Sequence, residues 1–280
     1  QKIMLWAKSA ELRDDHYATQ PIANEWTDVI ESGISLREIH TIAAIDGKTV
    51  TFEEPIHITL KEKYNVSVRS LGMINTVGIE DIRFTGNWPS YGEEFIHHKP
   101  GDPVHDYGWN MMAFEHVNNA WINNVEFKDF NQNLHFRTTS AITASNIKLT
   151  GQKGHSSIMI TQSYGVLVKD SEDSAGHHHG AGVAQRNTGA VYLRYKHKGE
   201  QRTDSHAGGP YVSLYDNVSK GHMSGNGGSH SAYPHHLKYW VAWNFDLDGG
   251  PDTYDFWRTE KRNGNTFLQP YFIGLQGKAV

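Results

Sequence analysis

The sequence has no cysteine in its 280 residues. This absence excludes disulfide bonds, thiolate nucleophiles, and zinc or iron–sulfur sites built on cysteine. Long apolar runs are also missing, because no stretch approaches the ~20 apolar residues that a membrane-spanning helix needs. The mean hydropathy of −0.59 agrees with this. We therefore expect no membrane partner.

An excess of positive charge is missing as well, since the formal net charge is −5 with histidine counted as neutral. A nucleic-acid partner is not indicated by such a balance, although a local cationic cleft for an anionic substrate can coexist with it. Residues 1–6 lack the n-region, apolar segment and cleavage site of a signal peptide. We interpret the chain as a mature or trimmed product, or as a fragment of a longer chain.

A short pattern recurs between residues 78 and 245: a small or amide residue followed by alternating apolar residues. Its copies are residues 80–84, 123–127, 145–149, 164–168, 189–193 and, more weakly, 239–243. Each copy alternates with a period of two, which predicts a strand with one buried face. From Val125 onward the copies return roughly every 20–25 residues, the spacing of stacked repeats. The pattern predicts an all-β solenoid of the parallel β-helix type.

We expect a single domain over residues 1–280, with repeated coils in 39–245, a loop insertion at 87–108 and a C-terminal cap at 246–280. The cap would close the open strand edge. Asp46-Gly47, between two alternating runs, predicts a β-hairpin. The insertion is long and rich in Trp, Tyr and His, which is typical of a loop that shapes a binding cleft.

Histidine is frequent, with 18 copies, and much of it lies in glycine-rich segments between residues 176 and 236. Glycine lets the backbone approach a ligand closely. A second family of strands lies between the copies of the pattern, and its outward positions carry polar and cationic groups. Successive coils of a β-helix stack about 4.8 Å apart, so residues one coil apart become neighbours. We therefore expect His135, Arg137, Gln162 and Arg186 to form one stripe on one face.

The coil pattern of residues 39–245, entered through the apolar strand and the Asp46-Gly47-Lys48-Thr49 turn, resembles the right-handed parallel β-helix superfamily of pectate-lyase-like carbohydrate-active enzymes. The resemblance implies a secreted or periplasmic protein whose partner is an acidic polysaccharide. It rests on the coil pattern and not on a signature motif, so no catalytic residue is carried over. We expect a monomer that needs no cofactor.

The abundance of His, Arg and Tyr favours β-elimination, in which a cationic group offsets the uronate carboxylate, a base removes the C5 proton and an acid protonates the leaving oxygen. We assign Arg137 and Arg186 as neutralisers, His178 or His206 as base, and Tyr192 or Tyr195 as acid. The residues expected to bind substrate are His135, Gln162, Trp88, Trp109, His222 and His230. Structural alternatives are an ion pair of Arg137 with Asp129 or Glu115, a turn-stabilising hydrogen bond of His206, and packing of Tyr192 in the coil.

Three other functions stay open. Hydrolysis would need two carboxylates, and the candidates are Asp170, Glu172, Asp173, Asp204 and Asp216, with Asp204 beside His206 the pair of most interest. A divalent metal could be held by His177 and His179 with Asp204 or His206. A non-catalytic solenoid could instead stack sugars on Trp88, Trp109 and Trp121.

Overall fold

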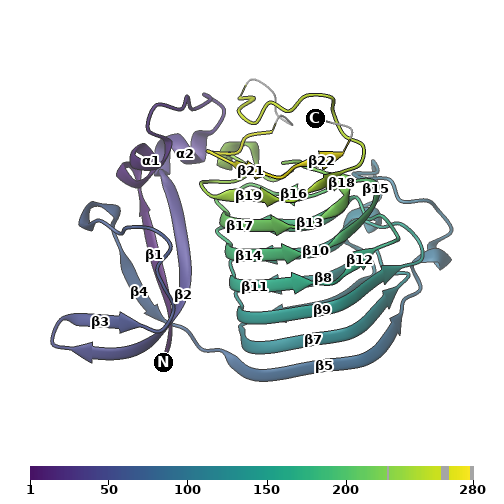
Figure 1. The fold of residues 1–280 in the computed structure, drawn as a ribbon, viewed down its shortest axis with the longest axis horizontal. Coiled ribbons are helices and arrows are strands. Elements are labelled where there is room, and N and C mark those ends of the chain that lie inside the picture. The colour runs from purple at the N-terminus through teal and green to yellow at the C-terminus, as the bar shows by residue number, and fades with distance from the viewer. Residues whose placement is uncertain (226, 260–264, 278–280) are drawn as a thin grey trace.

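The computed structural model describes residues 1–225, 227–259 and 265–277. It confirms the all-β class: about 51% of the chain is strand and 10% is helix, and parallel sheets form a β-solenoid of about six turns. Figure 1 shows the coils stacked from β5 at one end to β21 and β22 at the other, with a small separate sheet beside the stack. Within these described ranges, no helix is both long enough and apolar enough to cross a membrane.

The small sheet is antiparallel and comes first in the chain, with the strand order β3-β2-β1-β4. Its strands are β1 (Lys2–Ser9), β2 (Ile34–Asp46), β3 (Thr49–Phe52) and β4 (Ser67–Ser70). The connections contain α1 (Ala10–Tyr17), α2 (Thr27–Ser32) and the short 3-10 helix η1 (Glu62–Tyr64). Asp46 pairs with Thr49, so the expected hairpin at Asp46-Gly47 is present.

The parallel coils begin at Ile74, so residues 39–73 lie in the antiparallel sheet and its connections and not in the coils as we expected. A period of two is common to parallel and antiparallel strands, and the alternation alone could not separate the two arrangements. The coils also continue past residue 245, because β19 pairs with β21 and β20 with β22 in parallel. The expected C-terminal cap therefore contributes a further turn.

Each coil has three faces. Face 1 consists of β6 (Asn110–Glu115), β8 (Gln132–Arg137), β10 (Ser156–Thr161), β13 (His179–Ala184) and β16 (Asp204–Ser205). Face 2 contains β11 (Tyr164–Lys169), β14 (Thr188–Leu193), β17 (Tyr211–Asp216), β19 (Trp240–Trp243) and β21 (Tyr271–Ile273). Face 3 contains β12 (Glu172–Asp173), β15 (Lys196–Arg202), β18 (Ser219–His222), β20 (Asp246–Leu247) and β22 (Gln276–Gly277). In the first coils β5 (Ile74–Thr85), β7 (Val117–Lys128) and β9 (Ser140–Thr150) run through both face 2 and face 3.

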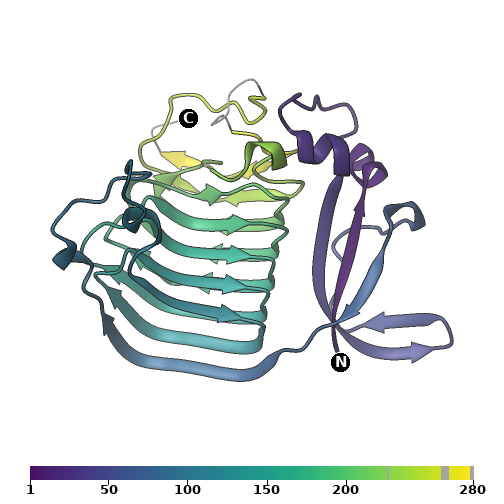
Figure 2. The ribbon, with the colours of Figure 1, turned by 180° about the vertical axis from the view of Figure 1, so that it is seen from behind.

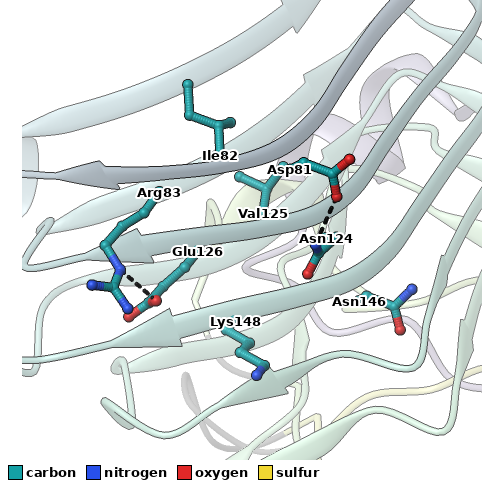
Figure 3. Close-up of a pocket in the computed structure, with 8 residues that line it drawn as sticks. All are labelled: Asp81, Ile82, Arg83, Asn124, Val125, Glu126, Asn146 and Lys148. Carbon is teal, nitrogen blue, oxygen red and sulfur yellow. Dashed lines mark hydrogen bonds and ion pairs between the residues drawn. The ribbon is translucent and has the colours of Figure 1, made fainter.

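The corner between faces 2 and 3 explains the recurring amide residue in the sequence pattern. The corner residues have left-handed φ angles in every coil, and they are Asp81, Asn124, Asn146, Asp170, Arg194, Asn217, Asn244 and Gly274. Asn, Asp and Gly tolerate this conformation better than other residues. Asn124 also donates a hydrogen bond to Asp81 at 2.7 Å, as Figure 3 shows. The amide residues therefore mark turns.

Two structures flank the coils on opposite sides, as Figures 1 and 2 both show. On one side, β2 of the small sheet is attached through Glu38, which accepts a hydrogen bond from Tyr211 at 2.9 Å. On the other side lies the insertion between β5 and β6, with the 3-10 helix η2 (Trp88–Tyr91) and the short helix α3 (Val104–Tyr107). A third 3-10 helix, η3 (His230–Ala232), lies near α2.

Candidate active site: a histidine cluster beside face 1

Five histidines gather beside face 1, and we call them the histidine cluster: His97, His155, His178, His179 and His206. His97 comes from the insertion, and the others come from three successive coils, with His178 and His179 in the same one. The parallel register pairs Ser156 of β10 with His179 of β13, which stacks the residues before these strands. The ring centroids of His97 and His178 are 4.0 Å apart, and those of His179 and His206 are 5.1 Å apart.

A buried carboxylate joins two members of the cluster. Oδ2 of Asp204 lies 3.0 Å from Nδ1 of His179 and 3.0 Å from Nδ1 of His206. The Asp204 side chain is fully buried, whereas 32% of the His206 side chain is exposed. Gly227 lets its loop cover the His206 ring, because a Cβ there would lie 2.2 Å from Cε1. This pair of a buried aspartate and a partly exposed histidine is the arrangement that orients a general base.

The charge state of the cluster follows from burial. Burial on its own would raise the pKa of Asp204, but the imidazoles of His206 and His179 outweigh it and hold that pKa below its usual range. Burial, with smaller contributions from neighbouring positive charges, lowers the pKa of His97 and His155 to about 4 and that of His178 to about 2. These three imidazoles are therefore neutral at neutral pH. An imidazole with a pKa of about 2 is a poor general base near neutral pH, so His178 does not suit the role that we expected of it.

Arg202 contributes positive charge close to the cluster. It lies at the end of β15, two residues before Asp204. Its charge contributes to the lowered pKa of both His97 and His178. The cluster therefore has a guanidinium near its imidazoles, as an anionic substrate requires.

The two tyrosines expected to act as acids lie inside the coil, which corrects that assignment. Tyr192 is fully buried, and its hydroxyl contacts the Gly182 amide at 3.0 Å and the Ile158 carbonyl at 3.0 Å. Tyr195 is also buried, with its hydroxyl 2.6 Å from Ser157 Oγ. Both belong to the aromatic core of the solenoid, which a substrate does not reach.

His135 and Arg137 do lie on face 1. Nη1 of Arg137 is 3.0 Å from Oε1 of Glu115, which confirms the ion pair that was considered as an alternative. Nε2 of His135 lies 2.9 Å from Thr161 Oγ1. Arg137 pairs with Thr161 and Thr161 with Ala184, and the register of the next strand continues this column to His206. Arg137 and His206 are therefore three strand spacings apart on one face, about 14 Å.

Gln162 and Arg186 do not continue that stripe, because they lie at the corner between faces 1 and 2, against the small sheet. Gln162 accepts a hydrogen bond from Arg37 of β2 at 2.8 Å. Arg186 lines a pocket of about 330 Å³ together with Ser35 and Gly209. The expected stripe is thus split, and Arg186 lies away from the column of Arg137 and His206.

The tryptophans that we expected to contact substrate also have a structural role in part. Trp88 is fully buried, donates from Nε1 to the Lys153 carbonyl at 2.8 Å, and has its ring 5.3 Å from that of Trp109. These rings fix the insertion to the coils. Trp121 is 36% exposed but lies on β7, away from the cluster.

His222 and His230, also expected to bind substrate, lie outside the cluster. His222 ends β18 on face 3, and a Cβ on Gly250 would lie 2.7 Å from its Cβ. His230 begins η3 and packs edge-on against Tyr233, with ring centroids 4.9 Å apart. Neither has a ring contact with the cluster among the described residues.

The metal ligands suggested by the sequence are brought together only in part. His179, Asp204 and His206 form a group whose ligand atoms lie within 4.8 Å of one another. His177, in contrast, is buried, with Nδ1 2.9 Å from Asp173 Oδ2 and Nε2 2.9 Å from Asn133 Nδ2. Every ring nitrogen of His177 has a partner, so this residue serves the core.

The carboxylates considered for hydrolysis are mostly engaged elsewhere. Asp170 forms an ion pair with Arg194 at 2.5 Å, and Asp173 is fully buried against His177. Asp204 is held between two imidazoles. These contacts leave no facing pair of exposed carboxylates among these three residues.

Two members of the cluster, His97 and His155, were missed by reasoning from the sequence. Gly154-His155 directly precedes β10, just as His178 directly precedes His179 at the start of β13 one coil later. The His179 amide donates to the His155 carbonyl at 2.8 Å, which locks the two turns together. Alignment of the coils by their strand starts could therefore have found His155. His97 had no such signal, because the path of the insertion is irregular.

A shallow depression of about 260 Å³ lies elsewhere, on the first three coils at the corner of faces 2 and 3 (Figure 3). Its polar side chains satisfy one another: Asn124 bonds to Asp81 at 2.7 Å, and Arg83 pairs with Glu126 at 2.7 Å. These are ladder contacts between neighbouring coils, so we assign this depression a structural role.

Comparison with known proteins adds a single match. The family model described as a domain of unknown function (DUF4955) matches residues 176–280. No curated protein and no solved structure matches the chain. The matched region contains Asp204 and His206 but neither His97 nor His155, so the histidine cluster extends beyond the part of the chain that resembles this family.

Proposed function

We propose that this protein cleaves an acidic, uronate-containing polysaccharide by β-elimination. The observation that carries the proposal is the Asp204–His206 pair at the edge of face 1, with Arg202 nearby. The parallel solenoid is compatible with the pectate-lyase-like superfamily, but a fold alone does not assign a reaction. Such a substrate would place the protein outside the cytoplasm, as a secreted or periplasmic enzyme.

His206 is the base in this proposal. Its Nδ1 faces Asp204 Oδ2, so Nδ1 carries the proton and Nε2 accepts one. Nε2 takes the C5 proton, the electron pair of that C–H bond forms the C4–C5 double bond, and the bond from C4 to the glycosidic oxygen breaks. The imidazolium then returns the proton to the leaving oxygen, so His206 takes over the role that we first expected of Tyr192 or Tyr195.

Cationic side chains support the negative charge of the substrate. Arg202 lies near the cluster and would offset the carboxylate of the reacting uronate, which makes its C5 proton more acidic. Arg137 lies on the same face about 14 Å from His206, where it would contact a uronate further along the polymer. Because its partner Glu115 is 49% exposed, Arg137 can exchange that ion pair for a substrate carboxylate at small cost.

A panel of uronate polysaccharides, some of them sulfated, tests the proposal. We expect ultraviolet absorbance of the new C4–C5 double bond to grow with at least one polymer. The His206→Gln variant should lose about 100-fold or more of that rate, as the loss of a general base predicts. The variant His116→Asn, at an exposed histidine outside the cluster, should retain it. Reducing ends without absorbance would instead indicate a hydrolase, and binding without any product would indicate a carbohydrate-binding solenoid.

A further inference from the structure

Three histidines of the cluster form a second, distinct arrangement. One ring nitrogen from each of His97, His155 and His179 lies within 4.8 Å of the other two. The ring centroids are 5.4 Å apart for His97 and His155, 5.4 Å for His97 and His179, and 4.7 Å for His155 and His179. Ligand nitrogens of a tetrahedral zinc ion are about 3.4 Å apart, given zinc–nitrogen bonds of about 2.1 Å. The three nitrogens therefore exceed that spacing by at most about 1.4 Å.

The surroundings of two of these histidines have the form that metal-binding histidines usually show. Nδ1 of His155 lies 2.6 Å from the Asp106 carbonyl oxygen, so Nδ1 carries the proton and Nε2 carries the lone pair. Nδ1 of His179 lies 3.0 Å from Asp204 Oδ2. A carbonyl or carboxylate behind the second ring nitrogen fixes the tautomer of a metal ligand and increases its basicity.

The nitrogen of His155 that faces the cluster lacks a protein partner. Its Nε2 is buried and has no hydrogen-bond partner within the described part of the chain. His177, one coil further along, has partners at both of its ring nitrogens. A buried imidazole nitrogen with a lone pair and no donor nearby is costly unless a ligand satisfies it.

We propose that His97, His155 and His179 bind one divalent transition-metal ion of the zinc class, with a coordination position left open for water. Imidazole nitrogens suit zinc, cobalt, nickel and copper better than calcium or magnesium. Three protein ligands with an open position are typical of catalytic zinc sites, whereas structural sites use four. The carboxylates of Asp204 and Asp106 would balance the charge of the ion. This proposal does not depend on the polysaccharide activity.

The test uses the full chain, expressed without a histidine tag and stripped of metal with a chelator. Titration calorimetry with Zn²⁺ should give one site per chain, and Co²⁺ should give the intense visible absorption of a tetrahedral complex. His97→Ala and His155→Gln should each abolish that Co²⁺ spectrum. Asp204→Asn should weaken Zn²⁺ binding about 10–100-fold, as the loss of a partner behind a ligand does. His116→Asn is the matched control and should leave binding unchanged.

Two results would overturn the proposal. Substoichiometric Zn²⁺ binding to the wild-type chain would show that no site is built. Loss of binding in His98→Ala but not in His155→Gln would place the ion between His97, His98 and Asp106, a neighbouring group with similar spacing. Circular dichroism of each variant reports folding. Should His155→Gln fail to fold, His97→Ala and His98→Ala together still decide the matter, because loss of binding in the first with retention in the second supports the proposed site, and loss in both overturns it.

Discussion

Nδ1 of His206 lies 3.0 Å from Oδ2 of Asp204, and the same oxygen lies 3.0 Å from Nδ1 of His179. One buried carboxylate thus orients two imidazoles with different surroundings. His206 is partly exposed, whereas the ring of His179 lies against those of His97 and His155. In our proposals, the imidazole on one side of Asp204 (His206) transfers the proton, and the imidazole on the other side (His179) binds the metal ion.

Removal of the Tyr192 hydroxyl should affect stability and not catalysis. Tyr192→Phe leaves the buried amide of Gly182 without its partner, which should cost about 1–3 kcal/mol of unfolding free energy. The rate of the folded variant on an acidic polysaccharide should match that of the wild type. Urea unfolding and the absorbance assay measure the two quantities. A 100-fold lower rate with unchanged stability would instead support Tyr192 as the catalytic acid.

Arg137 should matter for substrate binding alone. Both side chains of its ion pair with Glu115 are about half exposed, so Arg137→Ala should change the unfolding free energy by less than about 1 kcal/mol. We expect KM for the polymer to rise several-fold with kcat retained, and the difference from wild type to shrink at high salt. Arg83→Ala removes an ion pair with the partly buried Glu126, away from face 1. Equal effects of the two variants on KM would count against a substrate contact at Arg137.

Trp88 should hold the insertion in place. Its ring is fully buried against Trp109 and Tyr91, and Trp88→Ala should cost about 3–5 kcal/mol. Limited proteolysis should then cut within residues 92–103 sooner than in the wild type. Trp121→Ala, at a partly exposed ring, should cost far less. If the insertion stayed protected in Trp88→Ala, other contacts would have to anchor it.

Stability should fall as the pH drops from about 6.5 toward 4. Burial lowers the pKa of His197 and His236 to about 4 in the folded chain, while the unfolded chain titrates near 6.5. The unfolded state therefore binds more protons in this window, and each histidine should remove about 2 kcal/mol between pH 7 and pH 5. Asp173, whose pKa is lowered to about 2 despite its burial, adds a loss only below about pH 4.

Urea unfolding at pH 7 and pH 5 checks this prediction. His236→Gln should reduce the loss of stability between pH 7 and pH 5 by about 2 kcal/mol, because one titrating group is gone while His197 still titrates. The exposed His116 offers the comparison, and His116→Asn should keep the wild-type dependence. An unfolding free energy independent of pH between 7 and 5 would show that these imidazoles titrate alike in both states.

The solenoid was predictable because its turns favour particular residue types, which recur in the sequence. The left-handed corner favours Asn, Asp or Gly, so Asn124 and Asn146 recur at coil spacing. The hairpin at Asp46-Gly47 was predictable for a similar reason. The start of the coils was not, because β2 and β3 alternate with the same period as a coil strand while pairing antiparallel.

The site was only partly predictable. His206 and Asp204 could be identified from the sequence because they are two residues apart. The other members of the histidine cluster depend on how the coils stack. We expected both Tyr192 and Arg186 to face the substrate, yet Tyr192 lies inside the coil and Arg186 faces the small sheet. His97 reaches the cluster through a loop with no repeat, and its path depends on tertiary contacts of Trp88.

The most direct test of the catalytic role of the Asp204–His206 pair is the initial rate of double-bond absorbance on an acidic polysaccharide, measured for the wild type and for His206→Gln. We predict measurable elimination by the wild type and a loss of about 100-fold or more in the variant, with an unchanged circular dichroism spectrum. Elimination at the wild-type rate in His206→Gln, or no unsaturated product from any uronate polymer, would contradict it.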